Sequence, residues 1–420
     1  MSSFWRIFWL EFLGLVRTKT LGLLTFGSIV WMVVAPFVLV GDGTEAGARQ
    51  MCIRYALGGV VTLLSVSLLA SATGSIARER ASRRLQLTMV RPVRFVTIAL
   101  GKIAALSAAG ALVLALAVGI EAERQDLTRL CRHVVAPVLP SPRAEAEAMY
   151  EVYMNDPETP EEVKKTKKSI ILRLLTQRAV DHYQTIPTNE VARWTMPPAP
   201  SDMSGLAVRL RFTNAFDLRE DVRGTLTFAD ISGSVSNITR AVVEIPLSFP
   251  AVQTNRADEL TFENAGTAAV MLRPRKDIQL LVPADGFGWN LLRAYIELTG
   301  LLVLVISLGV FLGAGLGRAP ALFTAVVILI LSEISPSVVE QYPDELETNR
   351  ADRIGLALTR FAAEATHPLS TLVPLSKLAE DECVEPREVA RVSTVNMILM
   401  PFLFAVLSAL VLPRKEGGAD

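Results

Sequence analysis

The sequence predicts an α-helical polytopic membrane protein with six transmembrane helices. It also predicts a large α+β extracytoplasmic domain, β-sandwich-like, inserted between the third and fourth spans. Two observations lead to this fold class. The chain of 420 residues is 51% hydrophobic, has no net charge and has a mean hydropathy of +0.38, which lies between a soluble protein and a pure bundle of spanning helices. Its apolar residues also gather into six runs close to the roughly 20 residues that a helix needs to cross a bilayer.

The six runs and the segments between them define the predicted domains. The runs are 21–40, 55–76, 95–120, 298–317, 319–339 and 392–412. The predicted divisions are an N-terminal interfacial helix (1–20), spans one to three (21–120) with a loop at 77–94, an outer domain (121–290), spans four and five (291–339), an outer loop (340–391), and span six with a tail (392–420).

The charges flanking the runs predict the orientation of the chain. The segment 77–94 holds six arginines and one glutamate, and short basic loops stay in the cytoplasm. The segment 340–391 holds eleven acidic and six basic residues, which suits the opposite face. We therefore expect both termini to be cytoplasmic in a bacterial cytoplasmic (inner) membrane. Basic residues also mark the other predicted inner segments: Arg6, Arg17, Lys19, Arg318, Arg414 and Lys415.

The first 20 residues predict a helix lying in the inner membrane interface. Bulky apolar side chains fall on one helical face, and Arg6 and Arg17 fall together on another. This pattern is typical of interfacial helices. The alternative is that these residues simply extend the first span. The apolar face consists of Phe4, Trp5, Phe8, Trp9, Phe12, Leu15 and Val16.

The segment 121–290 is long enough for one independent domain. Its first part, 121–196, is predicted to be helical. In 204–285 the apolar period changes to two, as in the alternation of Leu206, Val208 and Leu210 with polar residues. Several short strands of this kind predict a sandwich or a small antiparallel sheet. The domain could grip a substrate, dock a periplasmic partner or cap the bundle, and the sequence does not choose among these roles.

The three cysteines fall on the outer side of the predicted topology, where disulfides are permitted. Cys131 and Cys383 are the candidates for a disulfide, while free thiols at all three positions are the alternative. No two of the three histidines have metal-ligand spacing, so we expect no metal site. A nucleotide-binding loop is absent, because Gly101-Lys102 lacks the upstream glycine and the following Ser or Thr. We therefore expect no enzymatic activity and no cofactor in this chain.

Polar residues within the runs are few. Glu333 and Asn396 are candidates for a translocation path, because ionisable residues inside a membrane commonly serve transport. The alternative for Glu333 is that it marks the end of its helix.

The order of parts resembles the membrane subunit of ATP-binding-cassette transporters of the type-two exporter kind. Residues 4–17 look like the connecting helix of that family, with Arg6, Glu11 and Arg17 as its charged positions. The loop between spans two and three is similar to the family's coupling-helix consensus, through Arg78-Glu79-Arg80, Leu85-Gln86-Leu87, Arg91-Pro92-Val93-Arg94 and Gly101-Lys102. One departure is Arg83-Arg84, where the family usually has a small Gly-Thr pair. The resemblance covers the membrane part, a little over half of the chain.

This resemblance implies a permease subunit that couples ATP hydrolysis by a separate ATPase to export. ATP and magnesium would be bound by the ATPase, and the second permease would be a copy or a sister chain. The residues implied to contact the ATPase are Arg78, Glu79, Arg80, Arg83, Arg84, Arg91 and Arg94. Attraction of these arginines to anionic membrane lipid is an alternative. Two other functions stay open: a non-transporting assembly that transmits force to a periplasmic partner, and a receptor or scaffold. We expect no nucleic-acid partner, and the cargo stays open.

Overall fold

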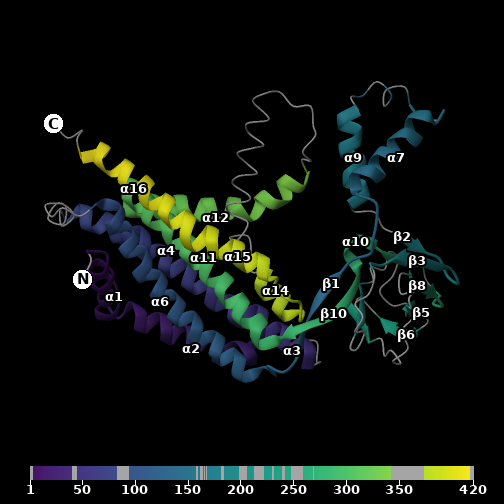
Figure 1. Cartoon of the computed structure of the whole chain (residues 1–420), viewed down its shortest axis with the longest axis horizontal. Helices are drawn as coiled ribbons and strands as arrows, with labels where there is room; N and C mark the ends of the chain where they lie inside the picture. Colours follow the sequence, from purple (N-terminus) through teal and green to yellow (C-terminus); the bar gives the residue numbers. More distant parts are fainter. Residues whose placement is uncertain are drawn as a thin grey trace. The chain divides into compact units, whose positions relative to one another are not determined.

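The computed structural model divides the chain into two compact units, which we call the helical unit and the sheet unit. The helical unit comprises Met1–Arg129, Gly286–Val339 and Ala351–Asp420, and the sheet unit comprises Leu130–Asp285 and Glu340–Arg350. The structure describes residues 3–39, 45–82, 94–157, 159–160, 164, 166, 168–180, 184–197, 206–211, 222–228, 231–238, 242–246, 259–267, 269–341 and 373–416 (Figure 1).

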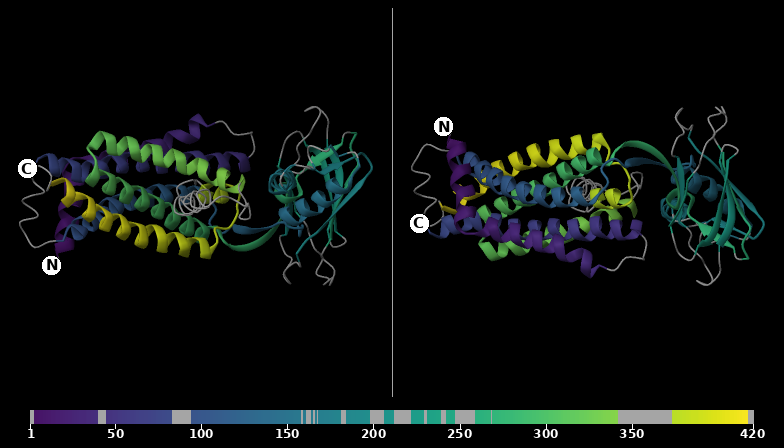
Figure 2. Two further views of the ribbon diagram at one scale, coloured as in Figure 1. Left: turned by 90° about the horizontal axis from the view of Figure 1, so that it is seen from above. Right: turned by 90° about the horizontal axis from the view of Figure 1, so that it is seen from below.

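The helical unit contains long helices joined by short ones. In chain order they are α1 (Ser3–Arg17), α2 (Thr20–Val38), α3 (Glu45–Met51), the π-helix η1 (Cys52–Leu57), α4 (Gly58–Ala81), α6 (Phe95–Arg124), α11 (Phe287–Gly315), α12 (Arg318–Gln341), α14 (Val373–Ala379), α15 (Pro386–Thr394), the π-helix η2 (Val395–Leu399) and α16 (Met400–Glu416). Figure 2 shows from two sides that the long helices run alongside one another.

Five helical stretches in the described part of the chain are long and apolar enough to cross a membrane. They are Thr20–Val38, Gly47–Arg80, Phe95–Arg124, Phe287–Gly315 and Pro386–Val411. Each covers most or all of one predicted run, so a multi-pass membrane protein is supported. The remaining run, 319–339, falls on α12, of which Arg318–Ile330 is a shorter apolar helix. The sixth span stays a prediction.

Helix α11 is the centre of the helical unit. Of its most apolar stretch, 89% is buried, against 22% for the corresponding stretch of α2. Glycines allow its close packing: a Cβ atom on Gly313 would lie 2.4 Å from the backbone oxygen of Thr73 on α4. The small residues of the fourth run therefore serve packing between helices of one chain, as small residues do in membranes.

Helix α1 is a separate helix and not an extension of α2. Thr18 and Lys19 interrupt the two helices, and Lys19 adopts the left-handed conformation with φ 59°. Its position in a membrane interface stays a prediction.

The described residues of the sheet unit form two four-stranded sheets and a two-stranded one, with strand orders β1-β10-β4-β7, β3-β8-β5-β6 and β2-β9. The described pairings are antiparallel; Leu210 of β4, for example, pairs with Ile278 of β10. One buried cluster includes Leu210, Phe228 and Phe262, which come from both four-stranded sheets, so these sheets share a core. The strands are β1 (Leu130–Val135), β2 (Gln184–Ile186), β3 (Val191–Thr195), β4 (Ala207–Arg211), β5 (Val222–Phe228), β6 (Ile231–Ile238), β7 (Val242–Pro246), β8 (Glu259–Asn264), β9 (Val270–Leu272) and β10 (Ile278–Gly286).

The sheet unit differs from the predicted outer domain in two respects, its secondary structure and its ends. The segment 121–196 contains helices α7 (Pro142–Asn155) and α9 (Lys168–Val180), but also strands β1, β2 and β3. Strand β3 forms because Ala192 and Trp194 are buried against a partner, β8, more than 60 positions away. The sheet unit also begins at Leu130 and its main segment ends at Asp285, in place of 121 and 290, because α6 and α11 are longer than the apolar runs on them.

Candidate functional site

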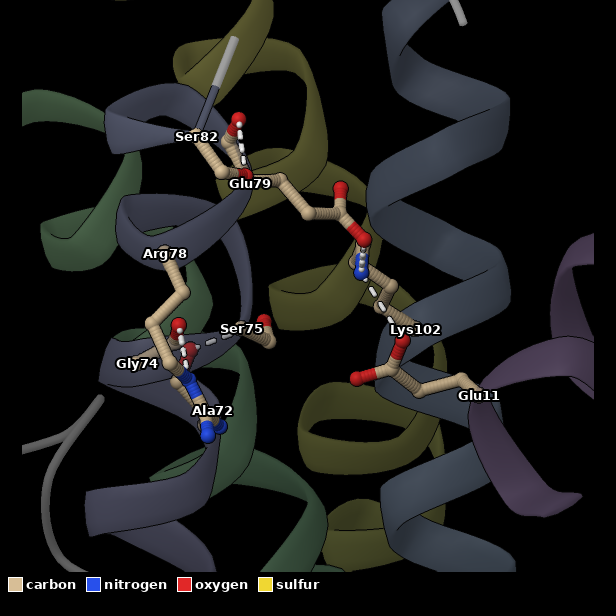
Figure 3. A network of polar contacts seen from close by, with 8 residues as sticks. All are labelled: Glu11, Ala72, Gly74, Ser75, Arg78, Glu79, Ser82 and Lys102. Carbon is tan, nitrogen blue, oxygen red and sulfur yellow. Dashed lines mark hydrogen bonds and ion pairs between the residues drawn. The ribbon is translucent and has the colours of Figure 1, made fainter. Parts of the chain in front are cut away.

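A buried lysine joins three helices of the helical unit. Lys102 lies on α6, and its side chain is only 3% exposed. Its Nζ atom donates a hydrogen bond of 2.8 Å to Oε2 of Glu11 on α1 and another of 2.8 Å to Oε1 of Glu79 on α4. Figure 3 shows the ammonium group between the two carboxylates. We call Glu11, Glu79 and Lys102 the lysine site.

The residue before Lys102 allows α1 to approach. A Cβ atom on Gly101 would lie 2.8 Å from Cγ2 of Ile7, so a larger residue would push α1 away from α6. Ile7 and Glu11 are four residues apart and share one face of α1. The face of α1 that meets Gly101 is therefore the face that carries Glu11 to the lysine.

An arginine beside the lysine site connects α4 to the C-terminus of α11. Arg80 donates hydrogen bonds from Nη1 to the Ala314 oxygen at 2.9 Å and from Nη2 to the Leu316 oxygen at 3.2 Å. The last carbonyls of a helix lack partners within it, and a cation there also complements the helix dipole. Arg78, by contrast, bonds within α4, from Nε to the Gly74 oxygen at 2.9 Å.

The electrostatics of the lysine site favour a fixed arrangement. The ammonium group is nearly excluded from solvent, whereas the side chains of Glu11 and Glu79 are 23% and 33% exposed. A buried charge without a partner is strongly unfavourable, so both ion pairs must persist while the lysine stays buried. The site holds the end of α4 and the start of α6 together against α1. These three side chains do not indicate a reaction on a substrate. Their contribution is to hold the three helices together.

The structure describes four of the seven residues implied to contact an ATPase. Arg78, Glu79 and Arg80 lie in the last turn of α4, so the loop predicted at 77–94 begins inside a helix. Arg94 is exposed and precedes α6 as its N-cap residue. Arg83, Arg84 and Arg91 lie outside the described residues.

The remaining predicted residues are placed as follows. Arg6 and Arg17 are exposed on α1, whereas Glu11 belongs to the lysine site. Asn396 lies on η2 and is completely buried. The backbone of Glu333 belongs to α12, but its side chain is outside the described part. Two cysteines, Cys131 and Cys383, are disulfide-bonded and Cys52 is free.

Sequence reasoning did not identify Lys102 as a site residue. The available signal was its position as the only charge in the run 95–120. A lone lysine two turns inside an apolar helix needs an acidic partner. Glu79, 23 positions away along the chain, could have been suggested by the short connection between the two runs. Glu11, 91 positions away, could not.

Comparison with known protein families, with curated proteins and with solved structures finds no match for this chain.

Proposed function

We propose that the chain is the permease subunit of an ATP-driven bacterial exporter, bound to separate ATPase subunits at the segment between α4 and α6. The observation that carries the proposal is the lysine site. Glu79 precedes this arginine-rich segment and Lys102 follows it, and Lys102 donates hydrogen bonds to both Glu79 and Glu11 of α1. A force applied between α4 and α6 is thus shared among three helices.

Arg80 would transmit such a force to the centre of the bundle. Its two hydrogen bonds hold the C-terminus of α11, the most buried of the five long helices. Movement of the last turn of α4 would move α11 with it. A chain that lacks a nucleotide-binding loop needs an outside source of work, and closure of an ATPase dimer against a basic segment is one that rigid helices can transmit. Arginines suit such a contact, because their guanidinium groups form paired hydrogen bonds with carboxylates.

A second function, force transmission to a periplasmic partner, is favoured by contacts at the outer end of α11. Asn290 donates from Nδ2 to the Glu382 oxygen at 2.7 Å and accepts at Oδ1 from the Val384 nitrogen at 2.7 Å. The Phe287 nitrogen bonds to the Arg129 oxygen at 2.7 Å, and Arg129 pairs with Asp381. The chain enters and leaves Leu130–Asp285 next to these residues, so a shift of α11 would reach both connections.

The first experiment is a pull-down of the tagged full chain from detergent-solubilised native membranes, with mass spectrometry of the co-purifying proteins. Recovery of an ATP-binding-cassette ATPase at about one copy per permease supports the proposal. Recovery without an ATPase, under detergent conditions that keep a known transporter complex intact, refutes it in favour of a receptor or scaffold. If the ATPase is present, substrate transport in vesicles then separates export from force transmission.

A neutralised lysine site tests the mechanical step. The triple variant Lys102→Met, Glu11→Gln, Glu79→Gln removes every charge together, and replacing a whole buried ion-pair set is often nearly neutral for stability. We expect a folded complex whose ATPase rate no longer responds to the permease. The matched control is Glu147→Gln, which removes the exposed pair with Arg143 on α7. A triple variant with wild-type coupling contradicts the role of the site.

A further inference from the structure

A buried amide and one oxygen of a half-buried carboxylate, on two helices that contact each other, lack hydrogen-bond partners among the described residues. Asn396 of η2 is completely buried, and neither atom of its amide group has a partner among the described residues. Glu297 of α11 has a buried Oε1 atom that also lacks one. A buried polar atom without a hydrogen bond destabilises the folded state. Three such atoms in one region indicate that something absent from the chain itself satisfies them.

Helix packing brings the two side chains to the same region. A Cβ atom on Gly300 of α11 would lie 2.8 Å from Cγ1 of Val392 and 3.7 Å from Cβ of Asn396. Gly300 therefore faces α15 and η2. Glu297 precedes Gly300 by three residues, so it lies on the same face of α11 about one turn away. The backbone positions of Glu297 and Gly300 are separated by roughly one helical turn, about 5 Å along the helix axis.

The charges around Glu297 leave it without a cation of its own. The charged side chains that interact with it electrostatically are Glu388 and Lys377. Lys377 is already bonded to Glu388, with Nζ 2.6 Å from Oε2. An unpaired carboxylate in apolar surroundings is strongly unfavourable. The arrangement is thus short of one positive charge.

We propose that Glu297 and Asn396 hold a monovalent metal cation, sodium or potassium, between α11 and η2. The carboxylate and the amide oxygen are the hard oxygen ligands that such ions prefer. One carboxylate balances one positive charge, whereas a divalent ion would leave an excess charge in an apolar site. The site differs from the histidine and cysteine type that the sequence excludes, and π-helical turns such as η2 are frequent at functional sites. It does not depend on an ATPase partner.

A proton shared between the two groups is the alternative to a metal ion. A protonated Glu297 bonded directly to Asn396 would give each a hydrogen-bond partner, and neither Oε1 nor the amide has one. The described structure therefore contains no direct hydrogen bond between the two groups, and the salt and pH dependence measured below separate an ion from a proton.

The test is thermal unfolding of the purified full chain in detergent, in choline, sodium and potassium chloride at equal ionic strength. We expect sodium or potassium to raise the unfolding temperature of the wild type relative to choline. Glu297→Gln and Asn396→Leu should weaken the apparent affinity about tenfold or more, or ~1.4 kcal/mol. The matched control is Glu121→Gln, a buried carboxylate on α6 that accepts from Gln125. Its Oε2 atom also lacks a hydrogen bond, but it has a cation of its own in Arg124, 3.8 Å away, so this variant should keep the response.

A gain-of-function variant covers the case in which the first variants do not fold. Asn396→Asp adds a second negative charge, so we expect calcium chloride to stabilise this variant more than sodium chloride does. The proposal is overturned if the wild type has the same unfolding temperature in all three salts. If that temperature then depends only on pH, a proton occupies the site. An unchanged response to sodium or potassium in both Glu297→Gln and Asn396→Leu overturns the assignment of these residues.

Discussion

Removing the charge from either side of the lysine site should have unequal effects on stability. In Lys102→Met, two hydrogen bonds to charged groups are lost, each contributing about 1.5–3 kcal/mol. The carboxylates left behind are 23% and 33% exposed, so water can hydrate them and recover part of this loss. In Glu11→Gln with Glu79→Gln, an ammonium group that is only 3% exposed loses both counter-charges. Breaking a buried pair in this way costs about 3–5 kcal/mol.

We therefore expect Lys102→Met to lower the free energy of unfolding by about 2 kcal/mol, near the lower end of these ranges. The double glutamine variant should lower it more. The assay is thermal unfolding of the purified proteins in one detergent, with Glu147→Gln as the control. That control breaks an exposed pair with side chains 47% and 50% exposed, and such pairs contribute at most about 1 kcal/mol. The reasoning is refuted if Lys102→Met is as destabilising as the double variant, or if neither differs from the control.

Three further predictions concern other contacts of the helical unit and the cysteines. Arg80→Ala should lower the unfolding temperature, because it removes two hydrogen bonds to the C-terminus of α11, and Arg80→Lys, which cannot form the same fork, should restore only part of the loss. Asn290→Leu should cost about 2–3 kcal/mol, since it leaves a buried backbone nitrogen without its acceptor; limited proteolysis should then cut sooner in the segment before α15. Maleimide labelling of the denatured, unreduced chain should modify Cys52 alone, and reduction should add Cys131 and Cys383; three labels before reduction would contradict the disulfide-bonded state.

The apolar runs could be located from sequence because spanning helices carry a strong compositional signal. Their ends could not, and α11 shows why. Residues 287–297 include Asn290 and Glu297, so the apolar run begins only at 298. The helix begins at Phe287 because the backbone of Glu382 and Val384 satisfies Asn290. A contact across more than 90 positions decides this boundary, and no local pattern contains it.

The strands missed in 121–196 have the same explanation. Val191–Thr195 alternates buried and exposed residues over only five positions, a signal too short to outweigh its surroundings. The strand exists because β8 supplies its hydrogen bonds and covers Trp194. Asn396 is the opposite case: a polar residue in an apolar run was visible in the sequence, but only the structure shows that its amide group lacks partners among the described residues.

The two polar sites of the helical unit differ in a way that separates their roles. At the lysine site, Lys102 has both carboxylates within hydrogen-bond distance, so the chain alone satisfies the buried charge and no ligand is needed to hold the helices together. At Glu297 and Asn396, no described residue satisfies the buried atoms, so the proposed cation would add to the stability of that packing. The lysine site joins α1, α4 and α6, whereas Glu297 lies on α11 and Asn396 on η2. Helix α11 connects the two regions, because Arg80 of α4 bonds to its C-terminal end and Glu297 lies toward its other end. An ion that stabilises the packing of α11 against η2 would therefore oppose any movement of α11 that begins at the lysine site.

The variants should separate the two sites. Glu297→Gln should change both the cation-dependent stability and the ATPase coupling, whereas the neutralised lysine site should change the coupling and leave the cation response intact.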